Sequence, residues 1–192
     1  MKKLLTLLTA GIIAGSSLMA YEGGTFFYSP KKYTKSDYFS LEMSAKYINY
    51  EDANGTTGGD LGVDFGISKR YVGYIGSTNI TYGIKGAIKL TGVNINDNSL
   101  FFTTGEVGPI LGYDVTRKTN IHIEGGYFAA WSKNFDSGTT DTRTGPYYGI
   151  GADFYLNDDL IVFVEGKQFI DSENTDNNAY TIRTGLRFPF WN

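Results

Sequence analysis

The residues that could support acid–base chemistry in this chain begin with its single histidine. His122 and Glu124 form a His-x-Glu pair, whose side chains would share one face of an extended segment. A histidine, a carboxylate and a serine together can hydrolyse an acyl ester. The second position after His122 carries Glu124 and not the serine that this motif requires. We therefore expect no catalytic residue here and interpret His122 as a hydrogen-bonding group.

Metal and cofactor sites are also poorly supported by the residue types. One histidine and no cysteine leave no basis for a thiolate or multi-histidine metal site. The 25 glycines form neither a G-x-G-x-x-G nor a P-loop pattern. The spacing Asp171-x-Glu173-x-x-Asp176 lacks the full pattern of a calcium loop, which favours a solvated loop over divalent-cation capture. We expect no metal ion and no cofactor.

A set of charged residues recurs at alternate positions in segments whose other positions are apolar. Side chains alternate between the two faces of a strand, so each segment predicts a strand with one apolar face and one face of charged and small residues. The charged faces would carry Glu42, Lys46, Asp64, Arg70, Lys85, Lys89, Glu106, His122, Glu124, Asp153, Glu165, Lys167, Arg183 and Arg187.

The strands that must position these charges are eight in number. They are expected near residues 39–47, 61–67, 80–90, 101–113, 121–131, 148–156, 160–167 and 180–190. The seventh is the least regular, because Ile161 and Phe163 fall on its charged side. Pro109 lies in the fourth and has no N–H, which predicts a bulge or a local defect in the hydrogen-bond ladder.

The links between the strands alternate in length. Shorter links are expected near residues 72–78, 116–120 and 157–159, and longer polar links near 51–60, 91–99, 132–143 and 171–178. An even number of strands with short turns on one side and long loops on the other is typical of bacterial outer-membrane barrels. The sequence therefore predicts an all-β protein, an eight-stranded antiparallel up-and-down transmembrane β-barrel.

The content of the two faces distinguishes a membrane barrel from a soluble one. A soluble lipocalin-like barrel, the alternative, would show the same periodicity but would point its apolar face inward. Here the apolar faces carry essentially no charge, and glycines and alanines crowd the charged faces, where a narrow lumen has little room. Aromatic residues stand near strand ends, as in interfacial girdles: Tyr47, Tyr71, Tyr113, Trp131 and Phe188. These features favour a membrane barrel with its charges inside.

The first twenty residues have the layout of a secretory signal. Lys2 and Lys3 precede an apolar stretch over residues 4–18, and cleavage is expected after Ala20. We expect residues 1–20 to be the signal peptide, 21–36 a short periplasmic segment, and 37–192 the barrel. Without the two signal lysines, 15 basic residues remain against 20 acidic ones, so the net charge falls from -3 to -5. That charge makes nucleic acid an unexpected partner.

The last predicted strand carries the most specific pattern. Apolar residues alternate toward a terminal aromatic, at Tyr180, Ile182, Leu186, Phe188 and Phe190. This resembles the C-terminal assembly signal of outer-membrane proteins, although two further residues, Trp191 and Asn192, follow it. With the eight segments, the mature chain resembles the OmpA/OmpX-type small outer-membrane barrel family over essentially its whole length. The resemblance implies insertion by the outer-membrane assembly machinery of a Gram-negative bacterium, among outer-membrane lipids and lipopolysaccharide.

The expected function follows from the narrow interior. Eight strands leave room for little more than side chains, and the inward acids and bases are nearly balanced. We expect a lumen closed by ion pairs, in a non-enzymatic barrel with a structural or surface-interaction role and an unspecified loop ligand. The alternatives are a small-solute or ion porin and, second, a lipid-modifying enzyme.

Overall fold

The computed structural model describes residues 37–51, 57–95, 98–135, 138–173 and 178–191. The predicted signal peptide and periplasmic segment lie outside these residues. The described strands are β1 (Asp37–Glu51), β2 (Thr57–Tyr74), β3 (Ile80–Ile95), β4 (Asn98–Thr116), β5 (Thr119–Asn134), β6 (Thr140–Asn157), β7 (Leu160–Phe169) and β8 (Ala179–Trp191). Among the described residues, no helix has the length and apolar character needed to span a membrane.

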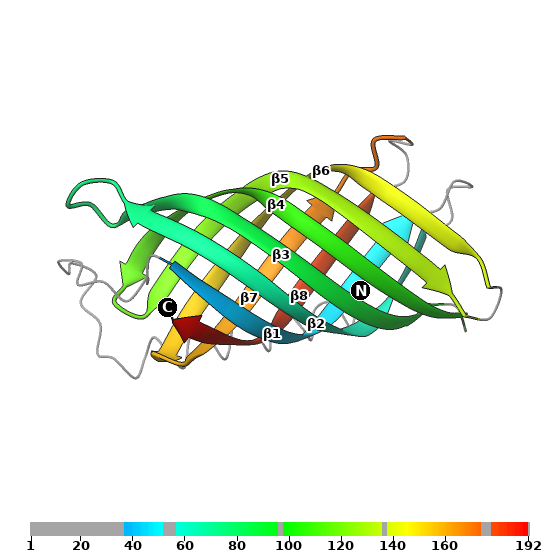
Figure 1. The fold of residues 1–192 in the computed structure, drawn as a ribbon, viewed down its shortest axis with the longest axis horizontal. Helices are drawn as coiled ribbons and strands as arrows, with labels where there is room; N and C mark the ends of the chain where they lie inside the picture. The colour runs from blue at the N-terminus through cyan, green and yellow to red at the C-terminus, as the bar shows by residue number, and fades with distance from the viewer. Residues whose placement is uncertain (1–36, 52–56, 96–97, 136–137, 174–177, 192) are drawn as a thin grey trace.

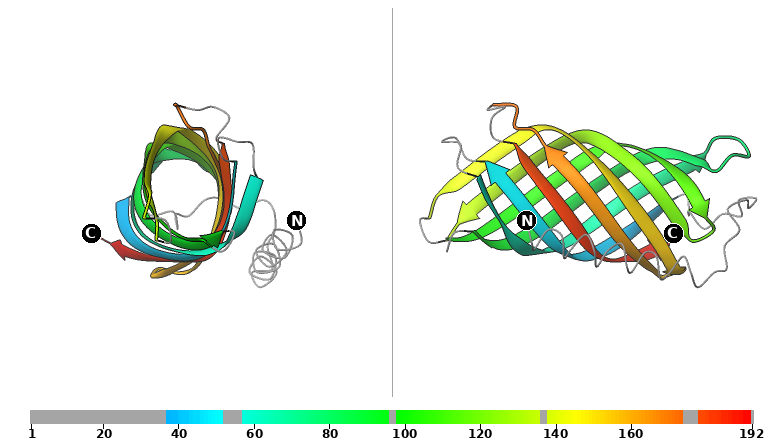
Figure 2. Two further views of the ribbon diagram at one scale, coloured as in Figure 1. Left: turned by 90° about the vertical axis from the view of Figure 1, so that its right-hand side faces the viewer. Right: turned by 180° about the vertical axis from the view of Figure 1, so that it is seen from behind.

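The eight strands close into one antiparallel barrel in sequence order, as predicted (Figures 1 and 2). Each strand pairs with its neighbours along the chain, and β1 closes the barrel against β8. In that closing pair Glu42 stands opposite Arg187 and Lys46 opposite Arg183. Glu42 and Arg187 carry opposite charges and help to fix the register of the seam, whereas Lys46 and Arg183 carry the same charge and each contacts a carboxylate elsewhere in the lumen.

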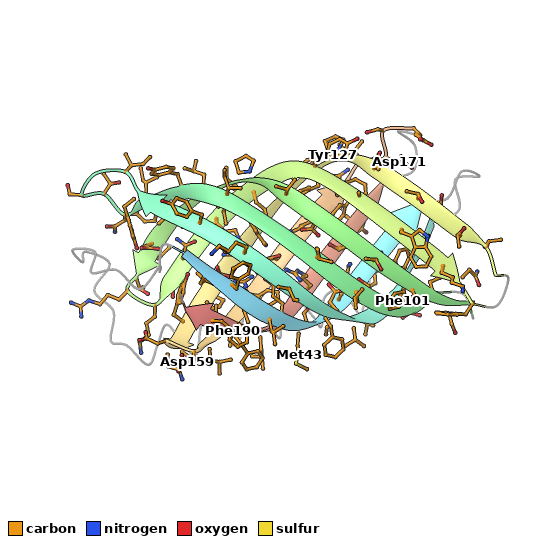
Figure 3. All side chains as sticks on the ribbon, viewed as in Figure 1. Met43, Phe101, Tyr127, Asp159, Asp171 and Phe190 are labelled. Carbon is orange, nitrogen blue, oxygen red and sulfur yellow. The ribbon has the colours of Figure 1, made fainter. Side chains whose placement is uncertain are left out.

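The two faces of the wall have the polarity of a membrane barrel. Apolar side chains such as Ile84, Ile88 and Ile150 are 60–65% exposed on the outside, while Lys85 and Lys89, which directly follow Ile84 and Ile88 in β3, are buried within. Met43 and Phe190 point away from the barrel in Figure 3. Charges are thus withdrawn from the outer surface and apolar groups are presented there, the arrangement that lipid requires.

Lys69 departs from the expectation that the apolar faces are uncharged. Its neighbours Ser68 and Arg70 are both buried in the lumen, so alternation turns Lys69 to the outside. The ammonium lies 4.3 Å from the centre of the Phe39 ring. A long side chain of this kind can lay its stem along apolar surface and carry its charge toward the membrane interface.

The link lengths differ from the sequence-based expectation at one end. Residues 75–79, 117–118 and 158–159 join strands at the end that holds both barrel termini, close to the short turns predicted there. At the other end the predicted longer link over residues 91–99 is wrong. The ladder between β3 and β4 continues to the pair Ile95 and Asn98. Polar side chains do not end a strand, because the antiparallel bonds join backbone groups only.

Pro109 interrupts the ladder on one side, without a bulge. It pairs with Ile84 of β3, whereas pairing between β4 and β5 is absent at Gly108 and Pro109 and resumes at Ile110 in the same register. The missing N–H of Pro109 therefore accounts for a local defect toward β5 only. Gly108 and Gly126 face each other at this point, and a Cβ atom on Gly108 would lie 2.6 Å from the Cα of Gly126. Glycine is required here because the two backbones approach closely.

Candidate functional site in the barrel lumen

The lumen is occupied by the charged side chains predicted for the inner faces. The structure places all of them inside the barrel, and none is more than 7% exposed: Glu42, Lys46, Asp64, Arg70, Lys85, Lys89, Glu106, His122, Glu124, Asp153, Glu165, Lys167, Arg183 and Arg187. We call this set the lumen charge network. Burying so many ionised groups is costly unless each charge has a partner.

Glu165 of β7 is the centre of the network. Its carboxylate accepts from Arg183 Nε at 3.0 Å and Nη2 at 2.8 Å, from Arg187 Nη2 at 3.0 Å, and from Lys85 Nζ at 3.0 Å. Register explains the first of these contacts, because Glu165 stands opposite Arg183 in the β7–β8 pair. On the β6 side it stands opposite Gly151, whose lack of a side chain leaves space for Glu165 and for the ring of His122.

Two further carboxylates share the same arginines. Glu42 of β1 accepts from Arg187 Nε at 2.8 Å and from Arg183 Nη2 at 2.7 Å. Asp153 of β6 accepts from Arg187 Nη1 at 2.7 Å and from Arg70 Nη1 at 2.5 Å. The arginines thus tie β1, β2, β6, β7 and β8 together across the interior. Such charge-assisted bonds are the stronger class of hydrogen bond.

An aromatic ring supports the two C-terminal arginines. Phe163 is fully buried, and its ring centre lies 4.7 Å from the Arg183 guanidinium carbon and 4.5 Å from that of Arg187. Guanidinium groups stack favourably on aromatic faces. The apolar residue that made the seventh segment irregular is therefore part of the lumen.

Lysines extend the network toward the other end of the barrel. Lys167 contacts Glu106 at 2.5 Å and Glu124 at 2.8 Å, and Lys89 contacts Glu106 at 2.6 Å. Lys85 joins this part to the centre, because it contacts both Glu124 at 3.2 Å and Glu165.

Lys46 and Asp64 form a looser pair beside these lysines. Their charged atoms are 3.6 Å apart, and Thr91 bridges them by accepting from Lys46 and donating to Asp64. The carboxylates and cations of the lumen therefore form a continuous set of contacts.

Apolar clusters lie beyond the charges at both ends of the lumen. Tyr38, Tyr155 and Ile161 pack together at the end that holds the termini. At the opposite end Ile48 and Val93 pack with Leu100 and Phe102, and a second cluster contains Phe128, Tyr147 and Phe169. Sequence reasoning missed most of these inward apolar residues, although strict alternation from the neighbouring charged positions would have placed them inside. They lie on either side of the charge network, together with buried polar groups such as Asp114 and Asn120 at the end that holds the termini.

His122 does not behave as the sequence predicted. It is buried, but neither ring nitrogen has a hydrogen-bond partner among the described residues, and Nδ1 lies 4.0 Å from Asp153 Oδ2. The carboxylate of Asp153 is instead directed at two arginines, whose charge-assisted bonds outcompete a neutral ring. The hydrogen-bond partner expected for His122 is therefore not found among the described residues.

The same histidine belongs to a cluster with the spacing of a metal site. Ligand atoms of His122, Asp153 and Glu165 lie within 4.8 Å of one another. Both carboxylates already accept from Arg70 and Arg187. A divalent cation would have to displace these fixed positive charges or remain beside them at low dielectric. We therefore assign no metal ion to this cluster.

The remaining predicted positions lie on the outer face of β8 and in the link before it. Tyr180, Ile182, Leu186, Phe188 and Phe190 all alternate with buried lumen residues, so the proposed assembly signal faces outward. In the link, Asp171 Oδ1 accepts from the backbone N–H of Glu173 at 3.1 Å, which is a local turn (Figure 3 labels Asp171). Asp176 lies outside the described residues.

Comparison with known proteins identifies the fold. No protein-family model and no curated protein matches the chain. It is similar to the solved structure of NspA, a Neisserial surface protein, with a TM-score of 0.56 and 12% identity over 79% of this chain and 97% of that one. For Ail of Yersinia pestis, in complex with the heparin analogue sucrose octasulfate, the TM-score is 0.52 and the sequence identity is 16%, over 80% of this chain and 97% of that one. For the N-terminal β-barrel domain of Pseudomonas aeruginosa OprF, the TM-score is 0.50 and the sequence identity is 14%, over 79% of this chain and 97% of that one.

At these identities the comparisons establish the fold alone. They confirm the OmpA/OmpX-type architecture that the sequence predicted. The fold and the apolar outer surface together place this chain in the bacterial outer membrane.

Proposed function

We propose that this chain is a non-enzymatic outer-membrane barrel with a closed lumen, serving the cell envelope in a structural or surface-interacting role. The observation that carries the proposal is the lumen charge network, in which Glu165, Glu42 and Asp153 share the guanidinium groups of Arg183 and Arg187.

The energetics of this network oppose the passage of ions. An ion that moved through the centre would have to separate arginine–carboxylate contacts, and a hydrogen bond to a charged group contributes about 1.5–3 kcal/mol. The contacts also share partners, so one cannot be separated without weakening the next. The apolar clusters beyond them line part of the path at both ends, where an ion would lose hydration.

Solute flux into vesicles tests the closed lumen. We expect vesicles that contain the refolded full chain to exclude small sugars and to hold a potassium gradient as well as protein-free vesicles do. Flux that scales with the amount of folded barrel would contradict the proposal and favour the porin alternative.

The surroundings of His122 support the non-enzymatic part of the proposal. The ring is buried, and among the described residues no hydroxyl group donates to it or accepts from it. A histidine that acts as a general base must reach the proton that it abstracts. We expect no release of fatty acid from lipopolysaccharide or phospholipid by the refolded chain. Release that is lost in His122→Ala would contradict this and favour a lipid-modifying enzyme.

A further inference from the structure

The outer wall of the barrel contains an apolar groove that extends from Phe188 of β8 across β1 to β5. Its volume is about 1010 Å³, and its floor includes Gly86, Gly105 and Ala129. Gly105 stands opposite Ala129, so small residues lie side by side on neighbouring strands. A Cβ atom on Gly86 or Gly105 would have no neighbour nearer than 3.8 Å. The absence of side chains at these positions therefore opens space on the lipid side of the wall.

The groove is large enough to hold part of an organic molecule. Pockets for small ligands commonly occupy about 300–1,000 Å³. Ile67 and Ile88 line it and are 56% and 63% exposed, so their side chains are available to an occupant. An occupant in contact with these residues must be apolar, because the wall faces the hydrocarbon core here.

A cation stands at one side of this groove. Lys69 lines it, stands opposite Gly86 on β3 and opposite Phe39 on β1, and places its ammonium over the Phe39 ring. Tyr71, two residues further along β2, is 64% exposed. An outward lysine beside outward aromatic residues, near the turn at residues 75–79, indicates the level of the lipid head groups.

We propose that this groove binds an anionic phospholipid, with its phosphate at Lys69 and an acyl chain across Gly86 and Gly105. Short turns and both barrel termini mark the periplasmic end of such a barrel, and Lys69 lies toward that end. The occupant is therefore a glycerophospholipid of the periplasmic leaflet and not lipopolysaccharide. The site depends on the outer-membrane location but not on a closed lumen, so it can fail or hold independently of the proposed function.

Native mass spectrometry of the refolded full chain tests the site, with dioleoyl phosphatidylglycerol, dioleoyl phosphatidylcholine and lipid A as probes. We expect the wild type to retain phosphatidylglycerol in preference to phosphatidylcholine by about fivefold, the effect of one lysine near an anionic lipid. Lys69→Gln should abolish the preference, and Gly86→Leu should reduce retention of both lipids by filling the groove.

Two matched controls separate the site from general effects of substitution. Gly166→Leu adds the same side chain to β7, where a Cβ atom meets nothing within 4 Å and the groove is absent. Lys133→Gln removes a lysine near the other end of the barrel, where it lies 5.6 Å from the Phe135 ring centre. Both should retain lipid as the wild type does. If Gly86→Leu does not fold, as shown by the loss of heat-modifiable gel mobility, Gly105→Leu is tested in its place.

Three results would overturn the proposal. One is equal retention by the wild type and the groove-filling variants. Another is a preference for lipid A over phosphatidylglycerol, which would place the groove in the opposite leaflet. The third is a dimer that displaces lipid and is lost in Gly86→Leu, which would make the groove an interface between copies of this chain.

Discussion

Removing one arginine from the lumen should destabilise the barrel far more than removing a peripheral lysine. In Arg183→Ala, Glu165 loses two donors at 3.0 and 2.8 Å, and Glu42 loses one at 2.7 Å. Breaking a buried pair by removing one partner costs about 3–5 kcal/mol, because the remaining charge is left uncompensated. Other cations still contact both carboxylates, which keeps the expected loss within that range.

The matched control is Lys46→Ala. Lys46 is buried in the same lumen, but it lies 3.6 Å from its carboxylate and makes one hydrogen bond of 3.2 Å, to Thr91. We expect Lys46→Ala to lower the free energy of unfolding by about 1–3 kcal/mol. Combining Arg183→Ala with Glu165→Gln should cost less than the sum of the single changes, with a coupling of about 0.5–3 kcal/mol.

The assay is denaturant unfolding of the refolded chain in lipid vesicles, and the folded fraction is measured by its gel mobility. If Arg183→Ala lowers the free energy of unfolding no more than Lys46→Ala does, the reasoning is refuted, because the central arginine then contributes no more than a peripheral cation. Strict additivity of Arg183→Ala and Glu165→Gln would refute the pairing itself.

Three other changes probe the wall and the aromatic support. Ile88→Arg places a charge on the lipid face and should oppose insertion by about 2–4 kcal/mol in vesicle refolding, whereas Thr78→Arg, in an exposed turn, should insert normally. Gly108→Val should slow or prevent refolding because β4 and β5 approach too closely for a side chain there, while Gly86→Val should refold; equal yields would be evidence against a close approach. Phe163→Ala should lower the unfolding free energy by about 3–5 kcal/mol, and a loss below 1 kcal/mol would show that the ring does not support the arginines.

Alternation in the sequence was sufficient to predict the eight strands and their two faces. Successive side chains of a strand must point to opposite sides, so Lys85 and Ile84 could be assigned without knowledge of the pairing. Strand ends were less predictable. Residues 91–99 are polar, yet β3 and β4 remain paired through most of them.

The partners within the lumen could not be predicted from sequence. Arg70 reaches Asp153 across 83 positions, and Arg183 reaches Glu42 across 141. These contacts depend on how the strands curve around the barrel and on which side chains meet at one level along its axis. The competition that leaves His122 without a hydrogen bond to any described residue depends on the same geometry, because Asp153 is directed at arginines from two other strands.

Single-channel recording on the refolded chain at neutral pH tests the closed lumen most directly. The lumen charge network predicts a wild type that remains at the baseline, and openings that become frequent in Arg183→Ala. The exposed pair of Arg143 and Asp141 provides the control, because Arg143→Ala leaves the network intact and should record as the wild type does. A large, steady conductance in the wild type that is unchanged in Arg183→Ala would contradict the account and establish an open pore.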